Sequence, residues 1–153
     1  MPKLHFSFFS RIRPLAIIIF LALIGILDTT YLLAERFLGG AVKCIAVQGC
    51  DTVLQSSYSN FFGFFPVALA GFLFYLAIFT LGLWLWGKSN ISFFVRNLFS
   101  GLTVFGLVFS GWFFYVQAVL LQAFCTYCLI SALDILLIFI VGIWWRYMVT
   151  NKL

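Results

Sequence analysis

Four long apolar runs dominate the sequence and limit what it can fold into. They cover residues 14–34, 64–86, 98–121 and 124–145. A helix needs about 20 apolar residues to cross a bilayer, and helices satisfy their own backbone hydrogen bonds there. Four such segments leave no room for a separate soluble domain in 153 residues. The sequence therefore predicts an all-α integral membrane protein, a single domain made of four transmembrane helices.

The composition excludes an ordinary soluble domain. Hydrophobic residues make up 65% of the chain and charged residues only 8%, whereas soluble domains carry about 25% charged residues. The net charge of +5 is therefore a signal of membrane topology and does not indicate nucleic-acid binding. A basic N-terminus before an apolar run also resembles a signal peptide. The segment Leu32–Arg36 offers no small-residue cleavage site, so we expect an uncleaved helix.

Basic residues predict the orientation of the helices, because cytoplasmic flanks are enriched in Lys and Arg. If the four helices alternate, only Arg36 and Lys43 fall on the side of the connection 36–63. The other basic residues fall on the opposite side: Lys3, Arg11, Arg13, Lys88, Arg96, Arg146 and Lys152. We expect a multi-pass protein of the inner (plasma) membrane with both termini in the cytoplasm. The connection 36–63 and a tight turn near Gln122 would then be extracytoplasmic.

The connection 36–63 is much longer than the about 2–8 residues usual between helices of a bundle. Long ordered loops are often functional, and the aromatic residues from Tyr58 to Phe65 are unsuited to a flexible tether. We therefore expect a short helix that lies on the mouth of the bundle with its apolar side down.

The predicted topology brings the four cysteines to one membrane face. Cys44 and Cys50 lie in the long loop, and Cys125 and Cys128 form a C-x-x-C where the fourth helix begins. An extracytoplasmic face is oxidising, and a helix N-terminus favours the reactive thiolate. We predict a redox relay between the two pairs. Chemically inert buried cysteines and a zinc site are the alternatives.

Such a relay needs an acceptor for two electrons within the membrane, and a lipid-soluble quinone is the natural one. Aromatic side chains form apolar pockets that suit a flat ring. The aromatic candidates for this pocket are Phe61, Phe65, Tyr75, Trp112 and Tyr115.

Three segments around these residues form a recognisable set. They are GCDTVLQSSY at 49–58, the spaced residues Gly63, Pro66, Gly71 and Tyr75, and FCTYCLISA at 124–132. Together they resemble the vitamin K epoxide reductase family, specifically its bacterial members. Similarity extends to residues 27–32 and 109–112, and so to most of the chain.

The resemblance implies a four-helix bundle around a quinone, with a half-helix in the first extracytoplasmic loop that caps the site. It implies that Cys44 faces a thioredoxin-like (DsbA-like) partner and that Cys50 attacks a disulfide at Cys125. Cys128 would then react with the quinone, which would be of the ubiquinone or menaquinone type.

Other positions take their roles from the same resemblance. Ser56 matches a family serine near the loop cysteines, and we expect it to support the cap together with Asp51. Val67 and Ala132 stand where vertebrate members place an asparagine and a tyrosine that hydrogen-bond the quinone. We expect Ala132 to lie beside a ring held mainly by stacking. Some bacterial members carry a fused thioredoxin-like domain, and because this chain ends at Leu153 we expect a separate partner.

Two carboxylates fall within predicted helices, where they are costly and often functional. Asp28 lies in the outer part of the first helix, and we consider either a proton role in quinone reduction or a structural role. Asp134 follows Cys125 by nine residues, which places it about 180° away from Cys125 at 100° per residue. We expect Asp134 to hydrogen-bond between helices and not to face the pocket.

These features predict a quinone-dependent thiol oxidase that reoxidises its thioredoxin-like partner and supports disulfide formation outside the cytoplasm. A DsbB-like enzyme would do the same on an unrelated sequence, but with the order of the two cysteine pairs reversed. Reduction of a vitamin K epoxide or quinone, as in vertebrate relatives, is another alternative. A non-catalytic membrane protein with structural disulfides or a bound metal is the alternative from a different class.

Overall fold

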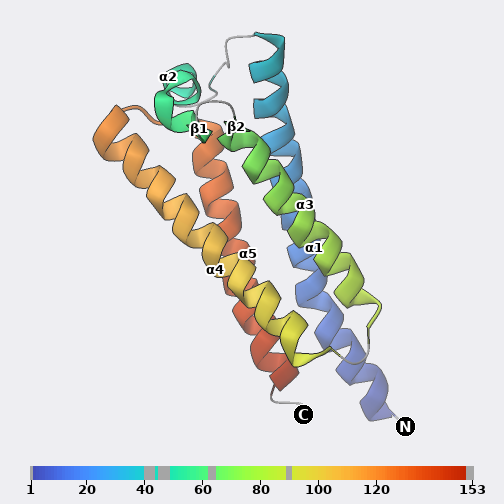
Figure 1. Cartoon of the computed structure of the whole chain (residues 1–153). Coiled ribbons are helices and arrows are strands. Elements are labelled where there is room, and N and C mark those ends of the chain that lie inside the picture. Colours follow the sequence, from blue (N-terminus) through green and yellow to red (C-terminus); the bar gives the residue numbers. More distant parts are fainter. Residues whose placement is uncertain (1, 40–43, 45–48, 62–64, 89–90, 151–153) are drawn as a thin grey trace.

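The protein is a bundle of four long helices (Figure 1). The computed structural model describes residues 2–39, 44, 49–61, 65–88 and 91–150, and it describes no side chain in residues 2–12 or at Phe61. The long helices are α1 (Pro2–Leu38), α3 (Val67–Trp86), α4 (Phe93–Tyr115) and α5 (Thr126–Thr150). Each of them contains a segment long and apolar enough to cross a membrane, which confirms the predicted fold class.

The helices are longer than the apolar runs that predicted them. Helix α1 begins at Pro2 and continues through Pro14, while α4 begins at Phe93 and α5 ends at Thr150. Lys and Arg are good helix formers, so the basic flanks extend the helices beyond the hydrocarbon core. Arg36 consequently lies in the last turn of α1 and not in the loop.

Helix α3 begins later than predicted, at Val67 instead of residue 64. Phe65 and Pro66 form a short strand, β2, that pairs antiparallel with β1 (Asn60–Phe61). A residue that precedes proline is restricted to extended conformations, which explains why Phe65 does not join the helix.

A short helix, α2 (Cys50–Gln55), covers one end of the bundle, whereas both chain termini lie at the other end (Figure 1). A 3-10 turn, η1 (Ser57–Ser59), and β1 follow it. Val53 and Leu54 of α2 are buried while Asp51 and Gln55 are exposed, so the helix lies with its apolar side down. This confirms the predicted half-helix cap, and "the cap" below means α2, η1, β1 and β2.

Helix α1 packs against both α3 and α5, and α4 packs against α5. Lipid tails are as apolar as the helix surfaces, so close packing rather than hydrophobicity holds such helices together. Glycines allow this close approach at Gly25, which faces the ring of Tyr75, and at Gly82, where a Cβ would lie 3.0 Å from Ile19. The main core extends from Leu15 in α1 to Trp145 in α5.

Replacing Gly25 with alanine is expected to destabilise the bundle by about 1–3 kcal/mol, the usual cost of overpacking a core. The new methyl group would overlap the Tyr75 ring, and that ring cannot retreat freely because its hydroxyl donates to the carbonyl oxygen of Ser131 at 2.9 Å. Reversible unfolding in detergent measures the change. Gly101→Ala is the matched control, because no atom lies within 4 Å of a Cβ there. Equal stability of the two variants would contradict this account of α1–α3 packing.

Candidate active site

The two loop cysteines form a disulfide at the start of the cap. Cys44 and Cys50 are bonded, with their Cα atoms 5.8 Å apart. Cys50 is the first residue of α2 and is buried, and Cys44 is half-buried. The backbone N–H of Cys50 also donates to Cys44 Sγ at 3.1 Å. The more accessible sulfur of this pair is therefore that of Cys44.

The C-x-x-C cysteines are free thiols at the start of α5. Cys125 directly precedes the helix and is buried, and its Sγ accepts a hydrogen bond from the backbone N–H of Cys128 at 3.3 Å. The sulfur thus takes the place that a serine or aspartate oxygen has at an ordinary helix N-cap. An N–H group at the N-terminus of α5 therefore contacts the sulfur of Cys125 directly.

Gln117 holds the backbone that leads into the C-x-x-C. It lies in η2 (Val116–Leu121), a π-helical continuation of α4, and such turns are frequent at functional sites. Its side-chain Oε1 accepts from the N–H of Cys125 at 2.8 Å, and its carbonyl accepts from the N–H of Ala123 at 3.2 Å. The chain reverses at Gln122, which has a positive φ of 48°, as the predicted turn requires.

The two cysteine pairs come together where the cap meets this turn. Cys50 and Cys125 belong to one buried cluster, against which Cys44 and Cys128 pack. Gly49 makes the approach possible, because a Cβ there would lie 2.6 Å from the carbonyl oxygen of Phe124. The residue before Cys50 thus lies against the residue before Cys125.

The Cys128 thiol lowers the pKa of Cys125 below its ordinary value by hydrogen-bonding to its sulfur, and this is the largest effect. Burial acts in the opposite direction, and backbone hydrogen bonds from Cys128 and Tyr127 add to the lowering. Cys125 precedes the fourth span, which begins at Thr126. A thiolate stabilised at this position is suited to disulfide exchange.

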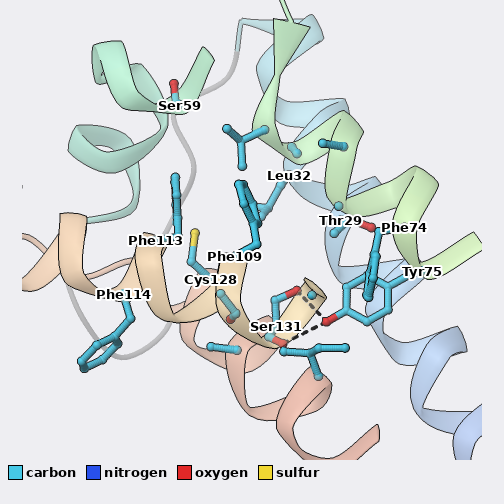
Figure 2. Close-up of a pocket in the computed structure, with 18 of the residues that line it drawn as sticks. Thr29, Leu32, Ser59, Phe74, Tyr75, Phe109, Phe113, Phe114, Cys128 and Ser131 are labelled. Atoms are coloured by element: carbon cyan, nitrogen blue, oxygen red, sulfur yellow. Dashed lines mark hydrogen bonds between the residues drawn. The ribbon is translucent and has the colours of Figure 1, made fainter. Parts of the chain in front are cut away.

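A cavity of about 240 Å³ opens beside Cys128, under the cap and between the helices. Pockets for drug-sized ligands have about 300–1,000 Å³, so this one suits a single ring system. Phe105, Phe109 and Phe113 line it from one face of α4, and their rings follow one another at centroid distances of 6.5 and 6.4 Å. Figure 2 shows the sulfur of Cys128 directed into the space that the lining residues enclose.

A comparison with family models matches residues 16–143 to the description "Vitamin K epoxide reductase family". The match covers most of the chain and includes all four cysteines. The chain belongs to the vitamin K epoxide reductase family. Proteins of this family are membrane oxidoreductases that link disulfide chemistry to quinones and generally work with thioredoxin-like partners. No match was found among curated proteins.

The pocket of this family member includes some of the side chains predicted for it and excludes others. Tyr75 and Ala132 line it. Trp112 and Tyr115 do not, because α4 turns them outward, where they are 57% and 48% exposed. The structure thus does not bring these two aromatic side chains to the cavity beside Cys128.

The two remaining aromatic candidates lie in the cap strands. Phe65, in β2, is half-buried, and it is not among the described residues that line the pocket. Phe61 lies in β1, and its side chain is outside the part of the chain that the structure describes.

Sequence reasoning missed most of the pocket wall. Helical spacing contained a signal for the aromatic row, because Phe105, Phe109 and Phe113 follow one another at intervals of four residues and so share a face. The polar groups in the wall had no such signal. Apart from Tyr75, which the sequence predicts, they come from several elements: Thr29, Arg36, Ser59, Ser110, Gln117 and Ser131.

Arg36 ties the cap to the end of α1. Its guanidinium donates to the carbonyl oxygen of Leu54 at 2.5 Å, to Ser59 Oγ at 3.4 Å and to Asn60 Oδ1 at 2.8 Å. Because a planar guanidinium presents several donors in fixed directions, one side chain fixes three successive parts of the cap. The cap is thereby held above the pocket.

Ser56 and Asp51 shape the cap itself. Ser56 ends α2, and its hydroxyl donates to the carbonyl oxygen of Val53 at 2.7 Å. Asp51 lies in the first turn of α2, is exposed, and accepts a hydrogen bond from Gln55 Nε2 at 2.8 Å. Both contacts lie within the cap, consistent with the supporting role that we predict for them.

Replacing Gly49 with alanine is expected to lift α2 from the C-x-x-C turn, because the methyl group would overlap the backbone of Phe124. Alkylation of Cys125, which is fully buried, should then accelerate at least about tenfold. This can be measured by mass spectrometry of the protein treated with a maleimide. Gly87→Ala serves as the control, since no atom lies within 4 Å of a Cβ at that position. An unchanged alkylation rate would show that the contact with Phe124 does not seal the site.

The Cys128→Ala substitution is expected to raise the pKa of Cys125, because it removes the thiol hydrogen bond that lowers this pKa most. The pH at which Cys125 is half-maximally reactive towards a small alkylating reagent should therefore move upward. This pH dependence is measured with the Cys44–Cys50 disulfide intact. Cys128→Ser, which retains a hydroxyl donor, should shift this pH less. A downward shift in the alanine variant would contradict the assigned cause.

Proposed function

We propose that the protein is a quinone-dependent thiol oxidase that reoxidises a thioredoxin-like partner and passes two electrons to a membrane quinone. The observation that carries the proposal is the position of Cys128, which is one of two adjacent free thiols and lines the aromatic pocket. The partner of Cys128, Cys125, lies in the same buried cluster as Cys50. Within one C-x-x-C, Cys128 is thus adjacent to the pocket and Cys125 is adjacent to the disulfide of the cap.

The burial of the four cysteines, with Cys44 and Cys128 less buried than Cys50 and Cys125, supports the following relay. A thiolate of the partner attacks Cys44, the more accessible sulfur of the outer disulfide, and releases Cys50 as a thiolate. The partner's second thiol resolves the mixed disulfide, so the partner is oxidised and Cys44 and Cys50 are reduced. Cys50 then attacks Cys125 when the inner pair is a disulfide, which frees Cys128. Cys44 resolves the Cys50–Cys125 bond and restores the outer disulfide.

In the proposed cycle, an outer disulfide with a reduced inner pair, the pairing that the structure contains, would follow this exchange. A quinone bound beside Cys128 would accept two electrons and two protons and leave the inner pair as a disulfide. The residues present fit such a ring: the aromatic row of α4 offers flat apolar surface, and Ser131 and Tyr75 offer hydroxyl groups in the wall. Arg36 and the cap restrict access of water.

The basic residues support a location in the inner membrane with cytoplasmic termini, by the positive-inside rule. Both termini lie at the end of the bundle opposite the cap (Figure 1). In this orientation the outer disulfide faces an oxidising compartment, where such bonds persist. The substrate partner would therefore be an extracytoplasmic protein with a reduced C-x-x-C.

The Cys128→Ala variant is expected to abolish quinone reduction, because the thiol beside the pocket is lost. The reduced partner should still open the outer disulfide, since Cys44 and Cys50 remain. Purified protein is mixed with reduced partner and a ubiquinone or menaquinone analogue, and quinol formation and free thiols are followed separately. Unchanged quinone reduction in this variant would refute the mechanism.

Cys125→Ala provides the matched variant on the other side of the C-x-x-C. Without its inner target, Cys50 cannot pass electrons on, so the outer pair should stay reduced after one exchange with the partner. A partner that lacks its second thiol should be trapped as a mixed disulfide with Cys44 on a non-reducing gel. A protein whose cysteines serve only as structural links would form no such species, and the outer pair would not react with the reduced partner.

A further inference from the structure

A buried polar cluster lies at the floor of the pocket. Tyr75 of α3 and Ser131 of α5 both line the cavity, and they are joined by two hydrogen bonds (Figure 2). The Tyr75 hydroxyl donates to the carbonyl oxygen of Ser131 at 2.9 Å, and Ser131 Oγ donates to the Tyr75 hydroxyl at 3.3 Å. Two hydroxyl groups are thus held side by side next to the place proposed for the quinone.

Each of these two hydroxyl groups has a buried carboxyl group as a neighbour. Asp28, on α1, is a neighbour of Ser131, and Asp134, on α5, is a neighbour of Tyr75. Neither aspartate is among the described residues that line the cavity. Asp134 therefore lies outside the pocket wall, as its position on α5 predicts, yet it reaches the pocket through a side chain of another helix.

Both carboxyl groups are in a setting that disfavours charge. Oδ2 of Asp28 and Oδ2 of Asp134 are buried and have no hydrogen-bond partner among the described residues. A buried charge without donors costs far more than a neutral carboxyl group, and two carboxylates near one another also repel. A neutral carboxyl group in turn carries a proton that it can donate.

Quinone reduction needs what this cluster can supply. Oxidation of two thiols to a disulfide releases two electrons and two protons, and reduction of a quinone to a quinol consumes two of each. The sulfur of Cys128 can deliver electrons, but the protons must reach two oxygen atoms of the ring.

We propose that Asp28 and Asp134 donate the two protons of quinone reduction, Asp28 through Ser131 Oγ and Asp134 through the Tyr75 hydroxyl. This inference rests on the proposed function. Each carboxyl group gives one proton to the pocket and later regains one, and the thiols of Cys125 and Cys128 supply two protons as their disulfide forms. The balance therefore closes with the inner pair oxidised, the quinone reduced and both carboxyl groups protonated again.

Asparagine replacements test the proposal, because the amide preserves the shape of the side chain but cannot act as the acid. Asp28→Asn and Asp134→Asn should each slow quinone reduction, and the double variant should lose at least about 100-fold, as expected when general acids are removed. Reduction of the outer disulfide by the partner should keep its rate. Asp→Glu variants should recover activity, and Glu35→Gln, which changes a carboxyl group near the end of α1, should behave as the wild type.

An infrared measurement supplies a readout that does not depend on turnover. The absolute spectrum of protein with reduced inner cysteines should contain a protonated-carboxyl C=O band, because both carboxyl groups carry a proton before quinone is reduced. This band should shift in D₂O and diminish in each asparagine variant. A wild-type spectrum without such a band would overturn the proposal even if the asparagine variants failed to fold.

The outcomes separate this inference from the function on which it rests. If wild-type protein reduces no quinone with any reduced partner, the proposed function fails. If the wild type is active and both asparagine variants turn over at its rate, only the proton-donor role fails. Loss of activity together with slower reduction of the outer disulfide would identify a structural role for the aspartates and would also overturn the inference.

Discussion

The lack of water inside a membrane is the constraint on which this structure depends. Backbone groups in hydrocarbon must be satisfied within the protein, and irregular backbone is tolerated only where protein buries it. The bundle meets this rule with long helices, except at the cap end. There, side chains take over: Gln117 accepts from the N–H of Cys125, and Arg36 donates to the carbonyl oxygen of Leu54. At this end the chain leaves the helices where such side chains stabilise it, and all four cysteines lie there.

This arrangement makes the two cysteine pairs chemically different. The outer pair begins a short helix at the surface of the bundle, and the inner pair begins a membrane-spanning helix beneath it. Cys125 is fully buried and receives hydrogen bonds from its own helix, whereas Cys44 is half-buried. In the proposed relay, electrons would therefore enter and leave by different sulfurs. The close contact of Gly49 with Phe124 keeps the two pairs within one packed cluster.

The fold and the cysteine pairs could be predicted because each depends on features that are local in sequence. Apolar runs define spans, and basic flanks and a long aromatic loop define the ends and the cap. The pocket wall could not be predicted in this way, because the rotation of each helix about its axis is set by packing against its neighbours, and aromatic residues lie on several faces of α4. Trp112 was expected inside and lies outside, while Phe109, three residues earlier, lines the cavity.

Asp134 illustrates what spacing along one helix can and cannot establish. Its angular distance from Cys125 correctly predicts that Asp134 lies outside the pocket wall. The same spacing could not predict the proximity of Asp134 to Tyr75, which extends across from α3. The contact between Tyr75 and Ser131 also bears on Val67 and Ala132. These are the apolar residues at positions where vertebrate relatives carry hydrogen-bonding groups. Both line the pocket. The pocket nevertheless contains polar groups. The hydroxyl groups come instead from Ser131, one residue before Ala132, and from Tyr75 on the neighbouring helix α3. Both have a buried aspartate as a neighbour.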